Sequence, residues 1–205
     1  MTAIETLNVH WLTVEFSHSD EPRDPREWDN VGKMICFHKN YVLGDKHDID
    51  DSLFEDFEEM KQYIIKELGA VVILPLRLHD HSWLSMDIWS ARDWDCWQVG
   101  FIYATQKEAD KEFDWDLTLL EERLRSEVDQ FDKYLRGEVY EYTILDDNWN
   151  IVDSCTWFTD YDWMKDEAVS MAEAEYKQRT KQKIDKRKQQ IKSKVPLEYR
   201  KPVSV

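Results

Sequence analysis

Glycine and cysteine are scarce in this chain, and their scarcity excludes several kinds of functional site. Five of the 205 residues are glycine, and they form neither a GxGxxG nor a GxxxxGK[ST] pattern, so a glycine-rich loop that cradles nucleotide phosphates is excluded. The three cysteines, Cys36, Cys96 and Cys155, form no CxxC pair. Their spacing argues against a disulfide framework and against a thiolate zinc site, and it favours a reducing compartment.

Long apolar runs are also missing. No run approaches the roughly 18 residues that cross a bilayer, and the N-terminus has no basic segment followed by an apolar core and a cleavage site. The remaining composition, 42% hydrophobic and 13% aromatic, is typical of a globular chain of about one domain. We therefore expect neither a membrane span nor secretion.

Acidic side chains outnumber basic ones, and the two kinds are unevenly distributed. The chain has 43 acidic and 27 basic residues, a net charge of −16. Residues 176–205 carry eleven Lys or Arg against two acids, a net +9, so residues 1–175 carry −25. This division predicts a single acidic α+β domain over residues 1–175 and a basic helical arm with a flexible tail over residues 176–205.

The surplus of acid has two interpretations. It either keeps a highly expressed protein soluble, or it engages a partner that normally binds nucleic acid, because clustered carboxylates can occupy a basic groove as phosphates do. The acidic body itself is not expected to bind nucleic acid. The basic tail is expected to contact an acidic partner or a second subunit.

Hydrophobic periodicity predicts an alternation of strands and helices. Strands are expected over residues 7–16, 33–38, 70–78, 98–104, 138–145 and 151–158. Helices are expected over residues 52–68 and 117–135 and from about residue 160 onward. This order indicates an α+β fold with a mainly antiparallel sheet of about five to six strands, covered by two or three helices, with a basic C-terminal helical arm.

Local signals refine these expectations. Ser52 and Glu55 form a capping-box pattern that starts the first helix, and Gly69 ends it. Pro75 cannot donate to a ladder, so its strand either has an edge or a bulge near its end or stops pairing there. The stretch over residues 79–97 has no regular period and is expected to be a loop. In the last helix, the residues expected to pack on the body are Met164, Ala168, Met171 and Ala172.

Residues able to bind a metal are densest just after the strand over 70–78. They are His79, Asp80, His81, Ser82, Asp87, Asp93, Asp95 and Cys96. On an extended chain His79 and His81 face one way and Asp80 the other, so two imidazoles could meet the carboxylate of Asp87 or Asp93 and hold a divalent metal. The alternative is that these polar groups satisfy the loop backbone. A similar choice applies to Cys36 and His38, which form either a thiolate–imidazolium pair or a buried structural cysteine with its neighbour.

Tryptophans and acids are the candidate residues for binding a partner. The tryptophans Trp83, Trp89, Trp94 and Trp97 either anchor a partner or cover the sheet. The acids lie in and before the first helix and around the second, and they either mimic phosphates or are a solvated surface: Asp48, Asp50, Asp51, Glu55, Asp56, Glu58, Glu59, Asp110, Asp114 and Asp116.

The stretch VVILPLRLHDHSWLSMDIWSARDWDCWQVGFIYAT, preceded by GKMICFHKNYVLGD and followed by DKYLRGEVYEYTI and IVDSCTWF, resembles a family of proteins carried by bacteriophages and other mobile elements. The resemblance covers roughly residues 30–160. It includes the DHS motif at 80–82 and a QVGFIY-like strand, but Trp83 stands where glycine is more usual, and the long basic C-terminal arm is a further departure. The family is mostly of unassigned function and supplies no catalytic residue. It implies a phage-borne protein in the cytoplasm of a bacterial host.

Three functional hypotheses follow. The first is a non-enzymatic phage accessory protein that inhibits a host defence or nucleic-acid-processing protein, with its acidic surface as a partial DNA mimic and no cofactor. The second is a small metal-dependent enzyme or metal-binding protein centred on His79, Asp80 and His81, with a divalent metal. The third is a scaffold that uses its basic arm. We favour a binding protein over an enzyme.

Overall fold

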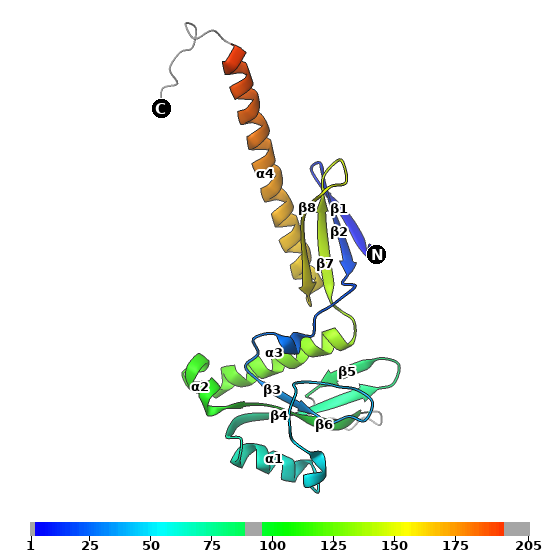
Figure 1. Ribbon diagram of the computed structural model, residues 1–205, viewed down its shortest axis with the longest axis vertical. Coiled ribbons are helices and arrows are strands. Elements are labelled where there is room, and N and C mark those ends of the chain that lie inside the picture. The colour runs from blue at the N-terminus through cyan, green and yellow to red at the C-terminus, as the bar shows by residue number, and fades with distance from the viewer. Residues whose placement is uncertain (1–2, 89–95, 195–205) are drawn as a thin grey trace. The chain divides into compact units, whose positions relative to one another are not determined.

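The computed structural model describes residues 3–88 and 96–194, which form α+β structure (Figure 1). Within these residues there are two antiparallel sheets of four strands each, together with four α-helices. The α+β class is confirmed, but the strands divide between two sheets instead of forming one sheet of five to six. Contacts group the chain into unit 1, residues 1–20 and 140–205, and unit 2, residues 21–139. These units divide the chain elsewhere than the expected boundary after residue 175.

Unit 1 contains a sheet built from both ends of the chain. Its strands, in spatial order, are β1 (Glu5–Val9), β2 (Leu12–His18), β7 (Tyr140–Leu145) and β8 (Ile151–Phe158). The single strand predicted over residues 7–16 is wrong, because His10, with a φ of 60°, turns the chain between β1 and β2. The hairpin predicted over residues 138–158 is confirmed as the antiparallel pair β7–β8.

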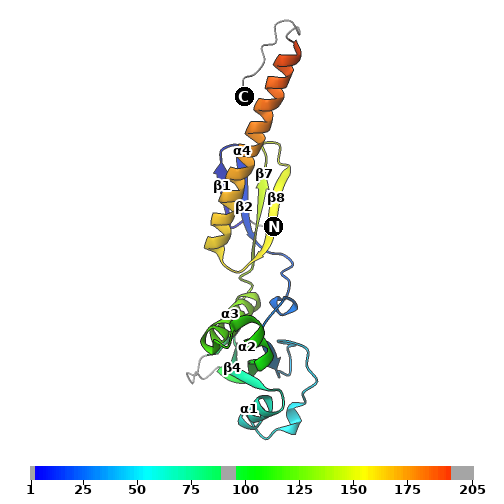
Figure 2. The ribbon, with the colours of Figure 1, turned by 90° about the vertical axis from the view of Figure 1, so that its left-hand side faces the viewer.

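One face of this sheet packs on α4 (Tyr161–Lys194), which lies in front of the strands in Figure 2. Met164, Ala168 and Ala172 are fully buried against the alternating core residues of β2 and β7. Spacings of four residues place these side chains on one helix face, and the alanines let the helix approach closely. The predicted packing is confirmed for these three, whereas Met171 stays 41% exposed.

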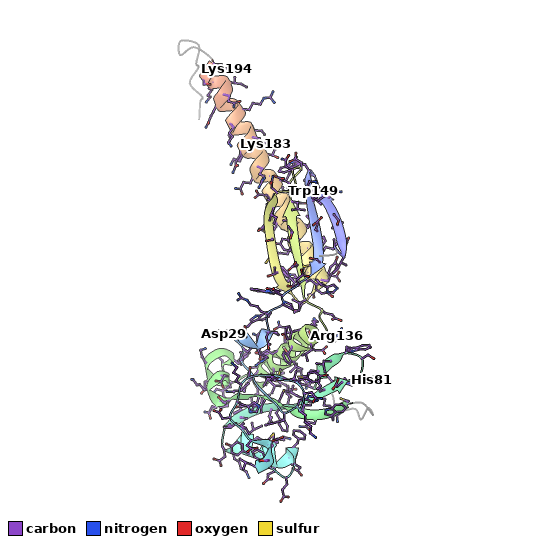
Figure 3. The ribbon with its side chains drawn as sticks, turned by 45° about the vertical axis from the view of Figure 1, so that its right-hand side comes forward. Asp29, His81, Arg136, Trp149, Lys183 and Lys194 are labelled. Atoms are coloured by element: carbon purple, nitrogen blue, oxygen red, sulfur yellow. The ribbon has the colours of Figure 1, made fainter. Side chains whose placement is uncertain are left out.

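The last part of α4 has few contacts with the sheet of unit 1, although Lys183 lies over the Trp11 ring. Every residue from 181 to 194 is exposed, and this part extends beyond the strand ends (Figure 1). It carries most of the basic residues counted above, including Lys183 and Lys194, which are labelled in Figure 3. Residues 195–205 lie outside the described part of the chain.

Unit 2 contains the second sheet. Its strands, in spatial order, are β3 (Lys33–Cys36), β6 (Cys96–Thr105), β4 (Ala70–Asp80) and β5 (Leu84–Asp87). β5 pairs with residues 77–80 of β4, so among the described residues no strand lies beside Pro75 on that side, and the register shifts between Leu76 and Arg77. The edge and bulge predicted from Pro75 are confirmed. The loop predicted over residues 79–97 is wrong where β4, β5 and β6 reach into it.

Helices cover both faces of the second sheet. They are α1 (Phe57–Lys66), α2 (Gln106–Phe113) and α3 (Leu117–Leu135), and Figure 1 shows α1 and α3 on opposite faces. Helix α3 is confirmed as predicted, whereas α2 was not expected. The predicted start at Ser52 is wrong: Asp56 caps α1 by accepting from the Glu59 N–H, and Ser52 lies in a separate 3-10 turn, η2 (Asp51–Leu53). No helix among the described residues is long and apolar enough to cross a membrane.

Arg26 and Glu127 form a buried ion pair that ties the segment before β3 to α3. Arg26 Nη1 lies 3.1 Å from Glu127 Oε2, and the two side chains are 3% and 0% exposed. The same guanidinium donates to the Asp45 carboxylate from Nε at 3.1 Å and from Nη2 at 2.9 Å. This bidentate pair of hydrogen bonds to one carboxylate is the geometry that suits arginine best.

The two carboxylates also satisfy backbone N–H groups. Glu127 accepts from Val31 N at 2.8 Å and from Gly32 N at 3.1 Å, and Asp45 accepts from Met34 N at 2.7 Å. Gly32 permits this approach, because a Cβ there would lie 2.4 Å from the side chain of Leu124 on α3. Burial opposes the positive charge of Arg26, but hydrogen bonds and charge from Asp45 and Glu127 outweigh it, so the pKa of Arg26 is raised.

Glu127→Ala is expected to destabilise unit 2 by about 3–5 kcal/mol, because it leaves the guanidinium of Arg26 buried without this partner. Glu127→Gln keeps an acceptor for Val31 and Gly32 and should cost less. Hydrogen exchange read by mass spectrometry reports on unit 2 separately from unit 1. Glu122→Gln, at an exposed site on α3, is the control and should change stability by less than about 0.5 kcal/mol. Equal effects of Glu127→Ala and the control would contradict the role given to the pair.

Candidate functional site

Three metal-ligand side chains meet where β4, β5 and β6 lie side by side. His79 pairs in register with Cys96 on β6 and with Ser85 on β5, while Asp87 pairs with Arg77, two residues before His79. One donor atom from each of His79, Asp87 and Cys96 lies within 4.8 Å of the others. Nε2 of His79 is 3.2 Å from Oδ2 of Asp87, and both side chains are partly exposed. Adjacent strands thus gather a nitrogen, an oxygen and a sulfur donor.

This group differs from the predicted set of His79, Asp80 and His81. The structure brings His79 to Asp87, one of the two carboxylates expected beside it, and to Cys96. Asp80 accepts a hydrogen bond from the Tyr41 hydroxyl at 3.4 Å, and His81 is exposed beyond the end of β4 (Figure 3). His79 and His81 share a pocket of about 350 Å³ that Asp80 does not line, as the predicted alternation requires. Asp93 and Asp95 lie outside the described residues.

The largest pocket found among the described residues of unit 2, about 900 Å³, lies between residues 36–47 and the ends of β4 and β6. The His38 ring stacks on Tyr41 with centroids 4.8 Å apart, and Nδ1 of His38 accepts from the Asn40 N–H at 3.2 Å. Asp80 and Trp97 line the same pocket. Its lining mixes the aromatic side chains of Phe37, Tyr41 and Trp97 with many charged and polar ones.

Cys36 lies against this pocket as a structural residue. The residue is buried, and burial raises the pKa of its thiol to about 12. A thiolate at neutral pH is therefore strongly disfavoured, which supports the buried structural cysteine over the thiolate–imidazolium pair with His38.

A continuous acidic segment, residues 48–59, precedes and begins α1. Its seven carboxylates are all exposed: Asp48, Asp50, Asp51, Glu55, Asp56, Glu58 and Glu59. No lysine or arginine occurs between residues 47 and 60, and within the described part of the chain no ion pair neutralises any of the seven. Asp50 and Asp56 cap η2 and α1, so local structure uses part of this charge.

A small apolar pocket opens inside the acidic segment. It has a volume of about 170 Å³, and it is lined by Phe37, Phe54, Phe57 and Met60 together with the acids Asp51 and Asp56. Leu53, at the end of η2, is 73% exposed close by in sequence. Carboxylates beside an apolar floor suit a lysine or arginine, because such side chains have an apolar stem and a charged end.

The other predicted acids lie around the turn between α2 and α3. Asp110, Asp114 and Asp116 are exposed, and Asp116 caps α3 by accepting from two backbone N–H groups. Asp114 and the following Trp115 have φ angles of 45° and 65°, and Trp115 is 48% exposed. Trp115 was not predicted as a binding residue, although its place between an acid-rich stretch and a helix cap was visible in the sequence.

The predicted tryptophan group does not form one surface among the described residues. Trp83 is 68% exposed and lines the pocket that contains His81, whereas Trp97 is 44% exposed and lines the largest pocket. Trp89 and Trp94 lie outside the described residues.

Comparison with protein-family models, with curated proteins and with solved structures finds no match to this chain. The resemblance to phage-borne proteins therefore stays a prediction.

In the folded chain, iodoacetamide at about pH 8 is expected to alkylate the exposed Cys155 and to leave Cys36 unmodified, because only the thiolate reacts. Peptide mass spectrometry measures each site. Since the fold raises the Cys36 pKa to about 12, this thiol stabilises the folded state at neutral pH, and the contribution is lost as pH rises from about 9 toward 12. Modification of Cys36 as fast as Cys155 without denaturant would contradict its burial.

Proposed function

We propose that this chain is a non-enzymatic binding protein whose acidic segment, residues 48–59, occupies a cationic surface of a partner protein that otherwise holds nucleic acid. The observation that carries this proposal is a set of seven exposed carboxylates beside an apolar pocket, none of them paired with a cation of the described residues. Unit 2 as a whole carries 28 acidic against 15 basic residues, a net charge of −13, so its field attracts cationic partners.

Recognition of the partner depends on two physical effects, electrostatic attraction and a fit to the apolar pocket. The carboxylates provide long-range attraction and fast association, and they replace phosphates in releasing the partner's counterions, so affinity should fall steeply with salt. The pocket lined by Phe54 and Phe57 provides short-range selectivity, because it accepts an apolar stem or ring between the acids of its rim. A host nucleic-acid-processing or defence protein offers such a surface, and inhibition follows from occupying it.

The exposed half of α4 supports a second candidate, a scaffold that holds an acidic partner or a second subunit. Nearly all of its charged residues are basic, and Lys183 Nζ lies 4.6 Å from the centroid of the Trp11 ring. This candidate predicts that association requires the basic half of α4 and not residues 48–59.

The acidic segment can be tested by neutralising four of its charges. Asp48→Asn, Asp51→Asn, Glu55→Gln and Glu58→Gln together keep the two capping residues and the side-chain shapes. A matched control neutralises four exposed acids elsewhere in unit 2 that have no ion pair with a described residue: Glu21→Gln, Asp29→Asn, Glu67→Gln and Glu122→Gln. Both variants change the net charge by the same amount.

Bacterial lysate proteins are bound to immobilised double-stranded DNA and eluted with each variant at matched salt. The wild type and the control are expected to release the same DNA-binding protein, and the segment variant to need roughly 10–100-fold higher concentration. A fluorescent peptide of repeating Arg-Leu tests the segment directly by anisotropy. If both variants lost elution activity equally, the effect would depend on net charge alone. If the wild type released no DNA-binding protein, the proposed mimicry would be overturned.

A further inference from the structure

We infer that His79, Asp87 and Cys96 bind one transition-metal ion of the zinc class. In a tetrahedral zinc site two donors lie roughly 3.3–3.7 Å apart, given usual metal–ligand distances of about 2.0–2.3 Å. The 3.2 Å between His79 Nε2 and Asp87 Oδ2 is close to this separation, and the Cys96 sulfur lies within 4.8 Å of both other donors. Small side-chain movements would complete the site.

The donor types select the metal. A thiolate and an imidazole favour zinc and its neighbours in the transition series, whereas magnesium and calcium prefer sites made of oxygen donors. With the Cys96 proton released, Asp87 and Cys96 supply two negative charges, which balance a divalent ion. Arg77 lies opposite Asp87 in the strand register and its charge opposes a cation, so the thiolate of Cys96 is essential to binding.

Paired strands carry all three donors. His79 and Cys96 face each other at the end of the long β4–β6 pairing, and Asp87 is on β5, which pairs with β4. Donors on paired strands are held more accurately than donors on loops. The competing interpretation is that His79 and Asp87 form a simple hydrogen bond and that Cys96 binds no metal. The two interpretations differ in whether Cys96 is a ligand.

Three protein donors leave the fourth tetrahedral position to water or to an oxygen atom of a small ligand, as in catalytic zinc sites. His79 also lines the pocket of about 350 Å³ that contains His81 and Ser82, so a small molecule can approach the donor group. This site shares no residue with the acidic segment, so either proposal can fail without the other.

Titration of the chelator-treated full chain with Co²⁺ tests the site. One equivalent is expected to bind, with a thiolate-to-cobalt charge-transfer band in the near ultraviolet and the visible bands of tetrahedral cobalt, and Zn²⁺ should displace it. Zn²⁺ should also protect Cys96 from iodoacetamide in the wild type while the exposed Cys155 still reacts. This protection assay needs no variant and so does not depend on any variant folding.

Variants then assign the donors. His79→Gln, Asp87→Asn and Cys96→Ser should each weaken binding by more than the roughly 10–100-fold that loss of a residue orienting a ligand costs. His81→Gln and Cys155→Ser are the matched controls and should still bind one equivalent. Cobalt binding without the charge-transfer band, unchanged affinity in Cys96→Ser, or Zn²⁺ that protects neither thiol would overturn the site.

Discussion

The buried pair of Arg26 and Glu127 is the interaction on which the arrangement of unit 2 depends. Glu127 on α3 accepts a hydrogen bond from the backbone just before β3, and Arg26 forms ion pairs with both Glu127 and Asp45. Asp45 in turn accepts from Met34 at the start of β3. A buried charge without a partner is strongly destabilising, so these contacts fix the path of the segment after β3. That segment forms the wall of the largest pocket and leads into residues 48–59.

The acids of unit 2 divide into two groups by what they bond. Glu127, Asp45 and Asp132 accept from backbone N–H groups of other segments, and Asp132 holds Met86 of β5 at 2.8 Å. These carboxylates stabilise the fold. The carboxylates of the acidic segment contribute little beyond capping its own turn and helix, and seven like charges on one short stretch oppose compaction. Because the fold does not need this negative charge, we propose that it binds a partner.

Strand register decides which residues form the metal-ligand group. The shift between Leu76 and Arg77 changes which residues of β4 and β6 face each other, and beyond it His79 pairs with Cys96. A slip of one residue would turn His79 to the other face of the sheet. The cysteine spacing lacks the CxxC pairs of an ordinary thiolate zinc site. A mixed set of donors from three strands leaves no such short motif in the sequence.

Local periodicity in the sequence was sufficient to predict α3, the β7–β8 hairpin, most of β4 and the buried stripe of Met164, Ala168 and Ala172, because each depends on residues a few positions apart. It misplaced the start of α1, because Ser52 and Asp56 are both good caps and the helix begins after Asp56. Only the tertiary structure decided that β1 and β2 pair with β7 and β8 in the sheet of unit 1, that Cys96 joins His79 and Asp87, and that Arg26 meets Glu127. Those contacts join segments far apart in the chain, and their selection depends on the packing of the whole unit, which no short window of sequence contains.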